Sequence, residues 1–249
     1  MFNKEYIVEL VLTITAALIS LGVHEFSHAL AAYKLGDPTA KNLGRLSINP
    51  LKHLDPFGAL CMIFFHFGWA KPVPINARNF KDPRRGFALS ALAGPLSNII
   101  LSFLLALIFL ICANTFHYTE NAFLNALMQN TLNFFYIFHA INVGLGVFNL
   151  IPIPPFDGSR LLGLLLPPKW YFKIMKHEKY IYWGVIAWLL LGRYVYTTLM
   201  SFSLISSNAF LSGIARCFSL SHLLSDAISF ISEIMMRFWT ILPFLNYPF

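Results

Sequence analysis

Four long apolar stretches constrain the fold of this chain more than any other feature. They run from about Ile7 to Tyr33, Phe87 to Ala113, Leu132 to Pro152 and Tyr180 to Met200. About 20 apolar residues allow a helix to cross a bilayer, and a helix satisfies its backbone hydrogen bonds internally. Charged residues make up only 12% of the chain, against about a quarter in soluble domains. We therefore predict an all-α polytopic membrane protein with about four to six transmembrane helices.

The connection between the first two stretches, from Lys34 to Arg85, contains a further apolar piece. This piece, from Ala59 to Trp69, is too short to span a membrane and is interrupted by His66 and Gly68. We interpret it as a small membrane-associated β or re-entrant segment.

The C-terminal region predicts an amphipathic helix. Its polar residues recur at spacings of three and four, at Asp226, Ser229, Glu233, Arg237 and Thr240. Such a helix lies at the membrane interface or packs its polar stripe on the other spans, and free exposure to lipid is disfavoured.

Basic residues alternate between the connections and so predict an orientation. Nine of the 18 Lys and Arg residues fall between Lys34 and Arg85, four fall between Lys169 and Lys179, and none falls between Asn114 and Thr131. Cytoplasmic loops carry the excess of basic residues. We expect the two basic connections in the cytoplasm and the N-terminus outside. The same rule explains the net charge of +7 without a nucleic-acid partner.

The first apolar stretch contains the motif HExxH, from His24 to His28. In a helix, residues four apart share a face, so the two histidines can bind one zinc ion while Glu25 stands beside the open position of the metal. Ionisable groups within a membrane are costly and therefore indicate a functional site. The alternative is a chance match, but this match falls where such residues are rare. The motif predicts metal-dependent hydrolysis, with Glu25 moving the proton.

The best candidate for a third zinc ligand is Asp157, because a catalytic zinc has three protein ligands and a water. It follows Pro152, Pro154 and Pro155, which end the third apolar stretch. Broken backbone near membrane depth is tolerated only where it is buried in protein or lines a wet cavity. In the alternative interpretation, Asp157 caps a short helix from Gly158 to Leu166. The presence of HExxH favours the ligand.

Three motifs follow one another along the chain, namely HEFSH at 24–28, AGPLSN at 93–98 and NxxPxPxxDG at 149–158. Through them the chain resembles the short prokaryotic form of the site-2 protease family of intramembrane zinc metalloproteases. The likeness covers about Leu21 to Leu166.

This resemblance implies a three-helix catalytic core that holds one Zn²⁺ per chain through His24, His28 and Asp157. It also implies Glu25 as the general base and a catalytic role for Asn149 near the reacting carbonyl. The implied activity is that of a zinc metalloendopeptidase that cleaves in or near transmembrane segments, as in regulated intramembrane proteolysis. The implied partners are the lipid bilayer and the transmembrane segment of a protein substrate. The enzyme would lie in a prokaryotic cell membrane with its active site toward the cytoplasm.

We expect one domain over residues 1–249, with the catalytic core at about 7–166 and C-terminal helices at about 180–249. Two alternatives stay open at this point. The break at Pro152 would also suit a membrane transporter or channel with an intramembrane polar site. Asn149 could instead satisfy backbone carbonyls that the break releases.

Overall fold

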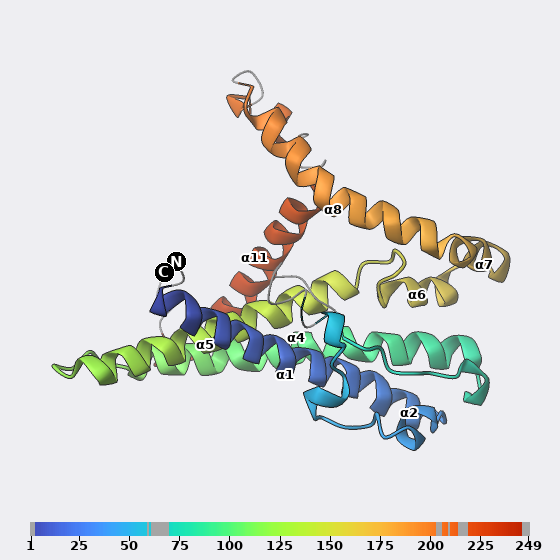
Figure 1. Ribbon diagram of the computed structural model, residues 1–249, viewed down its shortest axis with the longest axis horizontal. Helices are drawn as coiled ribbons and strands as arrows, with labels where there is room; N and C mark the ends of the chain where they lie inside the picture. Colours follow the sequence, from blue (N-terminus) through green and yellow to red (C-terminus); the bar gives the residue numbers. More distant parts are fainter. Residues whose placement is uncertain are drawn as a thin grey trace.

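The computed structural model describes residues 3–58, 60, 70–202, 206–208, 210–213 and 219–245 (Figure 1). Three long helices form its centre, α1 (Lys4–Lys34), α4 (Pro83–Thr115) and α5 (Ala122–Asn149). Between α1 and α4 lie the short helices α2 (Thr39–Asn42), η1 (Pro50–Lys52) and η2 (Ala77–Asn79). After α5 come α6 (Gly158–Leu165), α7 (Pro168–Lys176), α8 (Glu178–Met200) and α11 (Leu220–Trp239).

Each long helix begins at a side chain that accepts hydrogen bonds from its first turn. Asn3 accepts from the backbone N–H of Tyr6 before α1, and Asn121 caps α5 in the same way. Asp82 caps α4 and is followed by a proline at the first helical position. These caps satisfy backbone donors that have no partner within the helix. The starts of all three helices are therefore fixed by local sequence.

The three central helices are long and apolar enough to cross a membrane. The predicted all-α polytopic fold is confirmed, and within the described residues the only β pairing is an isolated bridge between Leu54 and Ala70. The fourth predicted span, Tyr180 to Met200, lies in the helix α8. Tyrosine, tryptophan and one arginine lower its apolarity, and it is not among the three candidate spans. Its crossing of the membrane stays a prediction.

The core lies where α1, α4 and α5 run side by side (Figure 1). α11 crosses α4 and α5 and buries Met235 and Met236 against Ala106, Leu110 and Val143. The helix was correctly predicted. Of the two positions expected for it, packing of the polar stripe on the spans is wrong, because Asp226, Ser229, Glu233 and Arg237 are exposed, and a position at the membrane interface stays a prediction. Within the stripe, Arg237 Nη2 and Glu233 Oε1 form an ion pair at 2.6 Å. The face that contacts α4 and α5 is mostly apolar, with Ser232 as a polar member that lies 2.6 Å from His139 Nε2.

The connection between α1 and α4 is tied to the end of α1 by Asp37. Its fully buried carboxylate accepts hydrogen bonds from Thr39, from the backbone N–H of Asn76 at 2.7 Å and from Asn79 Nδ2 at 2.6 Å. Burial alone would raise the pKa of Asp37, but these hydrogen bonds outweigh it and hold that pKa below its usual value. The ionised carboxylate thus fixes the segment at 70–76 beside α1. The predicted re-entrant piece lies outside the described residues, apart from Leu60.

Candidate active site

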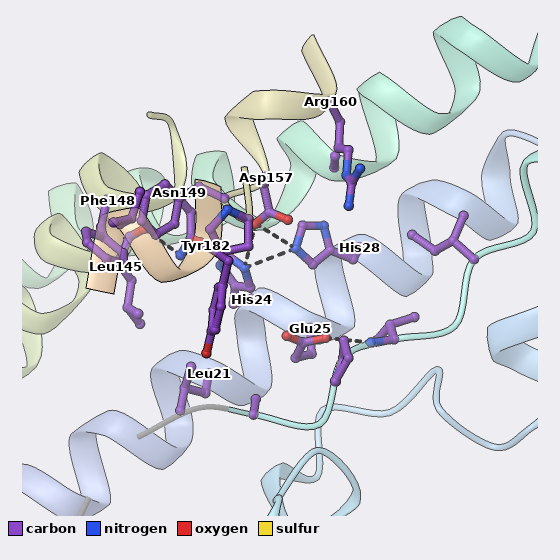
Figure 2. A pocket seen from close by; sticks show the side chains of 18 of the residues that line it. Leu21, His24, Glu25, His28, Leu145, Phe148, Asn149, Asp157, Arg160 and Tyr182 are labelled. Carbon is purple, nitrogen blue, oxygen red and sulfur yellow. Dashed lines mark hydrogen bonds and ion pairs between the residues drawn. The ribbon is translucent and has the colours of Figure 1, made fainter. Parts of the chain in front are cut away.

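The two histidines of HExxH lie on one face of α1, in its C-terminal half (Figure 2). His24, Glu25 and His28 are all buried. The two imidazole rings meet edge to face with their centroids 4.5 Å apart, and their Nε2 atoms are 3.0 Å apart. One turn of helix therefore brings together two nitrogen atoms that can bind the same metal ion.

Asp157 reaches this point from the chain break after α5. Its Oδ2 atom lies 3.1 Å from His24 Nε2 and 3.2 Å from His28 Nε2. The residue precedes α6, but its side chain makes no capping hydrogen bond. The helix-capping alternative is therefore wrong. The prolines follow the end of α5, and the Asp157 carboxylate points toward His24 and His28 on α1 (Figure 2).

The other ring nitrogens of the two histidines also have acceptors. His28 Nδ1 lies 2.8 Å from the backbone carbonyl of Ser90, and His24 Nδ1 lies 2.6 Å from Asn98 Oδ1. A nitrogen that donates a hydrogen bond carries the proton, which leaves the opposite nitrogen of the ring free for a metal. Both Nε2 atoms are thus prepared as ligands.

The donor set fits zinc. The Nε2 atoms of His24 and His28 and a carboxylate oxygen of Asp157 all lie within 4.8 Å of one another. Two imidazoles and one carboxylate leave one tetrahedral position for water or substrate, as catalytic zinc sites require. Within the described ranges, these three residues are the one group that could hold a metal.

Glu25 stands beside this group and is held by a backbone donor. The N–H of Val73 donates to its Oε2 at 2.9 Å (Figure 2). Val73 lies between two prolines, Pro72 and Pro74, in the segment that Asp37 anchors at Asn76. The carboxylate of Glu25 is thereby fixed from outside α1.

The group opens into a cavity of about 700 Å³. Its walls come from α1, the 70–75 segment, the start of α4, the end of α5, the 155–160 segment and α8, and include Phe87, Phe148, Val185 and Leu189. The walls are mostly apolar, and the polar residues that line the cavity are His24, Glu25, His28, Asn149, Asp157, Arg160 and Tyr182. A cavity of this size can take several residues of an apolar peptide beside a reactive polar centre.

Asn149 lines the same cavity at the last residue of α5. Its Nδ2 atom donates to the backbone carbonyl of Leu145 at 3.0 Å. The side chain therefore satisfies a helix carbonyl, as one of the two interpretations expected, and also faces the cavity in which a substrate carbonyl would lie (Figure 2). Its role in catalysis stays a prediction.

Sequence reasoning missed three contacts at this site. Val73 and Ser90 act through backbone atoms, so their side chains carry no signal. Asn142 accepts a hydrogen bond from Asn98, and the sequence does carry a signal that could have identified Asn142. It is polar, lies in an apolar stretch and precedes Asn149 by seven residues, so it faces the same side of α5. The histidines His53 and His139 hydrogen-bond elsewhere, to Ser47 and Ser102.

The buried histidine pair, the facing carboxylate and the adjacent glutamate, set among membrane helices, define a zinc metalloprotease of the membrane-embedded class. The model of peptidase family M50 matches residues 12–192. The chain belongs to this family, and it is a zinc metalloprotease.

The relatives agree with this membership. YwhC of Bacillus subtilis (strain 168), a candidate zinc metalloprotease, is 42% identical over 174 residues, which cover 70% of this chain and 76% of YwhC. Rip2 of Mycolicibacterium smegmatis, also a candidate zinc metalloprotease, is 30% identical over 66% of this chain and 61% of its own. The zinc metalloprotease MJ0392 of Methanocaldococcus jannaschii is 28% identical over 64% of this chain and 35% of its own. No solved structure matches the chain.

Proposed function

We propose that this protein cleaves peptide bonds in or near the transmembrane segments of other membrane proteins. The observation that carries the proposal is the position of His24, His28 and Asp157. Their ligand atoms lie within 4.8 Å of one another, at an apolar cavity beside helices that can cross a membrane. A soluble peptide would gain little from such walls, whereas an apolar segment would bury its side chains against them.

In this proposal His24, His28 and Asp157 hold the zinc ion. When bound, the ion supplies a Lewis acid that polarises the peptide carbonyl and makes water a nucleophile near neutral pH. Glu25 takes the proton from the attacking water and delivers it to the leaving amine. The Val73 N–H keeps the Glu25 carboxylate in place, at 2.9 Å. Asn149 is placed to donate to the oxyanion that forms at the carbonyl carbon.

The substrate binds in an extended form, because a helical peptide bond is shielded by its own hydrogen bonds. The 70–75 segment lines the cavity and lies outside any helix, so it supplies an edge along which an extended peptide can lie. Pro72 and Pro74 carry no N–H, so the 70–75 segment would bind the peptide mainly through the carbonyl oxygens of the segment. The apolar walls would receive alternate side chains.

The site faces the cytoplasm of a prokaryotic cell. The described residues of the two basic connections expected there, within 34–85 and 169–179, lie at the same end of the helices as α6, whereas the start of α1 and the connection between α4 and α5 lie toward the opposite end (Figure 1). The positive-inside rule then supports a cytoplasmic position for the end that carries the basic residues.

The test compares membrane-protein fragments in cells that carry the wild type or Glu25→Gln. This variant keeps the three ligands, so the purified protein should retain one zinc per chain. Turnover should fall by about 10²–10⁴-fold, which is the usual contribution of a general base. Uncut precursors should then accumulate, with cleavage sites inside or at the border of a transmembrane segment. Unchanged cleavage would refute the role of Glu25, and sites confined to soluble domains would refute the substrate class.

A further inference from the structure

A chain of buried hydrogen bonds leads from His24 through α4 to α5. Asn98 Oδ1 lies 2.6 Å from His24 Nδ1, and Asn98 Nδ2 donates to Asn142 Oδ1 at 2.7 Å. Asn142 Nδ2 donates to Ser20 Oγ, back on α1, at 2.8 Å. Ser20, Asn98 and Asn142 are each 0% exposed, so water does not compete for these contacts. The three helices are joined by one polar network beneath the metal site.

Two backbone carbonyls, which can only accept, fix the donor-to-acceptor direction of this series of hydrogen bonds. Asn142 Nδ2 also lies 2.7 Å from the carbonyl oxygen of Phe138, which can only accept. Ser20 Oγ donates to the carbonyl of Ala16 at 2.7 Å and therefore accepts from Asn142. The Asn142 amide must then turn its nitrogen toward both of these groups. Its oxygen is left to face Asn98.

The same reasoning continues to the histidine. Asn98 Nδ2 donates to Asn142 Oδ1 and to the backbone carbonyl of Ser20 at 3.2 Å. Both donors of this amide are thus used, and its oxygen must face His24 Nδ1. Since that oxygen can only accept, Nδ1 carries the ring proton. The lone pair of the ring is placed on Nε2, the atom that faces Asp157 and His28.

We propose that Asn142 is a positioning residue for the metal site, which acts through Asn98 to select the metal-binding tautomer of His24. This inference rests on the proposed role of His24 as a zinc ligand. The second ligand needs no such support, because His28 Nδ1 donates directly to the backbone carbonyl of Ser90 at 2.8 Å. Without Asn142, the Asn98 amide loses its shorter hydrogen bond, and only the 3.2 Å contact with the Ser20 carbonyl opposes a rotation that would present its nitrogen to His24. His24 Nδ1 would then accept a hydrogen bond from Asn98 Nδ2, and the proton of the His24 ring would lie on Nε2.

The test measures the zinc affinity of the full-length protein in detergent by competition with a chelator. Asn142→Leu keeps the approximate volume and removes the amide. We expect its zinc affinity to fall about 10- to 100-fold, as for other partners that orient a metal ligand. Affinity within twofold of the wild type, in a variant with a normal gel-filtration profile, would overturn the inference.

Ser102→Ala is the matched control. Ser102 and His139 form a second buried network between α4 and α5, with Ser102 Oγ 2.8 Å from His139 Nδ1, and it continues to Ser232 on α11. It lies about one turn away from the Asn98–Asn142 pair and does not reach a proposed ligand. This variant should lose thermal stability and keep its zinc affinity. An equal loss of affinity in both variants would mean that general destabilisation is the cause, and would overturn the inference.

Two further measurements distinguish a failure of the inference about Asn142 from a failure of the assignment of His24 as a zinc ligand. His24→Ala should lose zinc altogether, and retention of tight zinc binding would refute the ligand assignment itself. If Asn142→Leu does not fold, the wild-type protein still provides a test. In the protein with ¹⁵N-labelled histidine, the His24 signal, identified by its loss in His24→Ala, should show a protonated Nδ1, the atom that faces Asn98 Oδ1. An Nδ1 atom without a proton would overturn the inference.

Discussion

Gly94 of α4 lies directly against the imidazole ring of His28. A Cβ atom at Gly94 would overlap His28 Nε2 and would lie 2.5 Å from its Cε1 and 2.8 Å from His24 Cε1. Only a residue without a side chain allows α4 to approach α1 this closely. The absence of a side chain on α4 is thus part of the proposed metal site.

Gly94→Ala should therefore displace both histidine rings and abolish tight zinc binding. The measurement is the zinc content of the purified protein after dialysis against a weak chelator. Gly144→Ala is the matched control on α5, because the nearest atom to its added Cβ is 3.7 Å away, an ordinary contact. It should bind zinc like the wild type. Full zinc content in Gly94→Ala would show that the site tolerates a wider separation of the helices.

Loss of the N–H group of Val73 should impair catalysis without affecting the metal. Val73→Pro removes the donor that lies 2.9 Å from Glu25 Oε2. A hydrogen bond to a charged group contributes about 1.5–3 kcal/mol, so kcat should fall by about tenfold or more while zinc content stays unchanged. Val73→Ala keeps the N–H and should retain most of the activity. An equal decrease in both variants would assign the effect to the lost side chain.

Asp37 should make the stability of the protein depend on pH. The pKa of Asp37 is lowered in the folded protein, so its stabilisation is complete above the unfolded value of about 3.9 and is lost as the pH falls through the folded value. Asp37→Asn should lower the thermal midpoint at neutral pH, because its amide nitrogen would face the donors at Asn76 and Asn79. The difference from the wild type should shrink below about pH 4.

Asp55→Asn is the control for this measurement, since Asp55 accepts one hydrogen bond, from the N–H of Gly58. It should shift the thermal midpoint less than Asp37→Asn at neutral pH. A difference between Asp37→Asn and the wild type that stays constant down to pH 3 would contradict the linkage to the Asp37 carboxyl.

The proposed orientation can be tested with a short epitope tag. A tag near Glu120, in the connection between α4 and α5, should be accessible only from outside the cell. A tag at Lys52, in the basic connection, should be accessible only after the membrane is permeabilised. Labelling of intact cells at Lys52, and not at Glu120, would reverse the orientation.

Local sequence predicted the parts of the site that local geometry decides. His24 and His28 share a face because a helix repeats every 3.6 residues, and three prolines within four residues after α5 prevent that helix from continuing. The direction of the Asp157 carboxylate depends on a contact across 133 positions, so the residues around Asp157 do not distinguish capping from ligation, and only the distant HExxH motif favoured the ligand. The Val73 N–H is a backbone group, so the identity of the side chain at this position does not reveal its contact with Glu25.

The error at α11 has a physical origin as well. One of the two positions expected for this helix placed its polar stripe against the other spans. Glu233 and Arg237 instead form an ion pair across one turn, which satisfies both charges without help from another helix. The apolar face, with Met235 and Met236, then packs on α4 and α5. Pairing within a helix and pairing between helices have the same sequence pattern.

The division of the three proposed ligands between two distant parts of the chain sets an order of assembly. The ribosome makes α1, with His24 and His28, long before it makes Asp157. During that interval the two histidines and Glu25 are in the membrane without a carboxylate to complete the site, which is costly for ionisable groups. α4 comes next, and it brings Ser90 and Asn98, the acceptors for both rings. The site is thus shielded when α4 docks and becomes competent for metal only when the chain after α5 folds back, so the unfinished protein has no active protease centre.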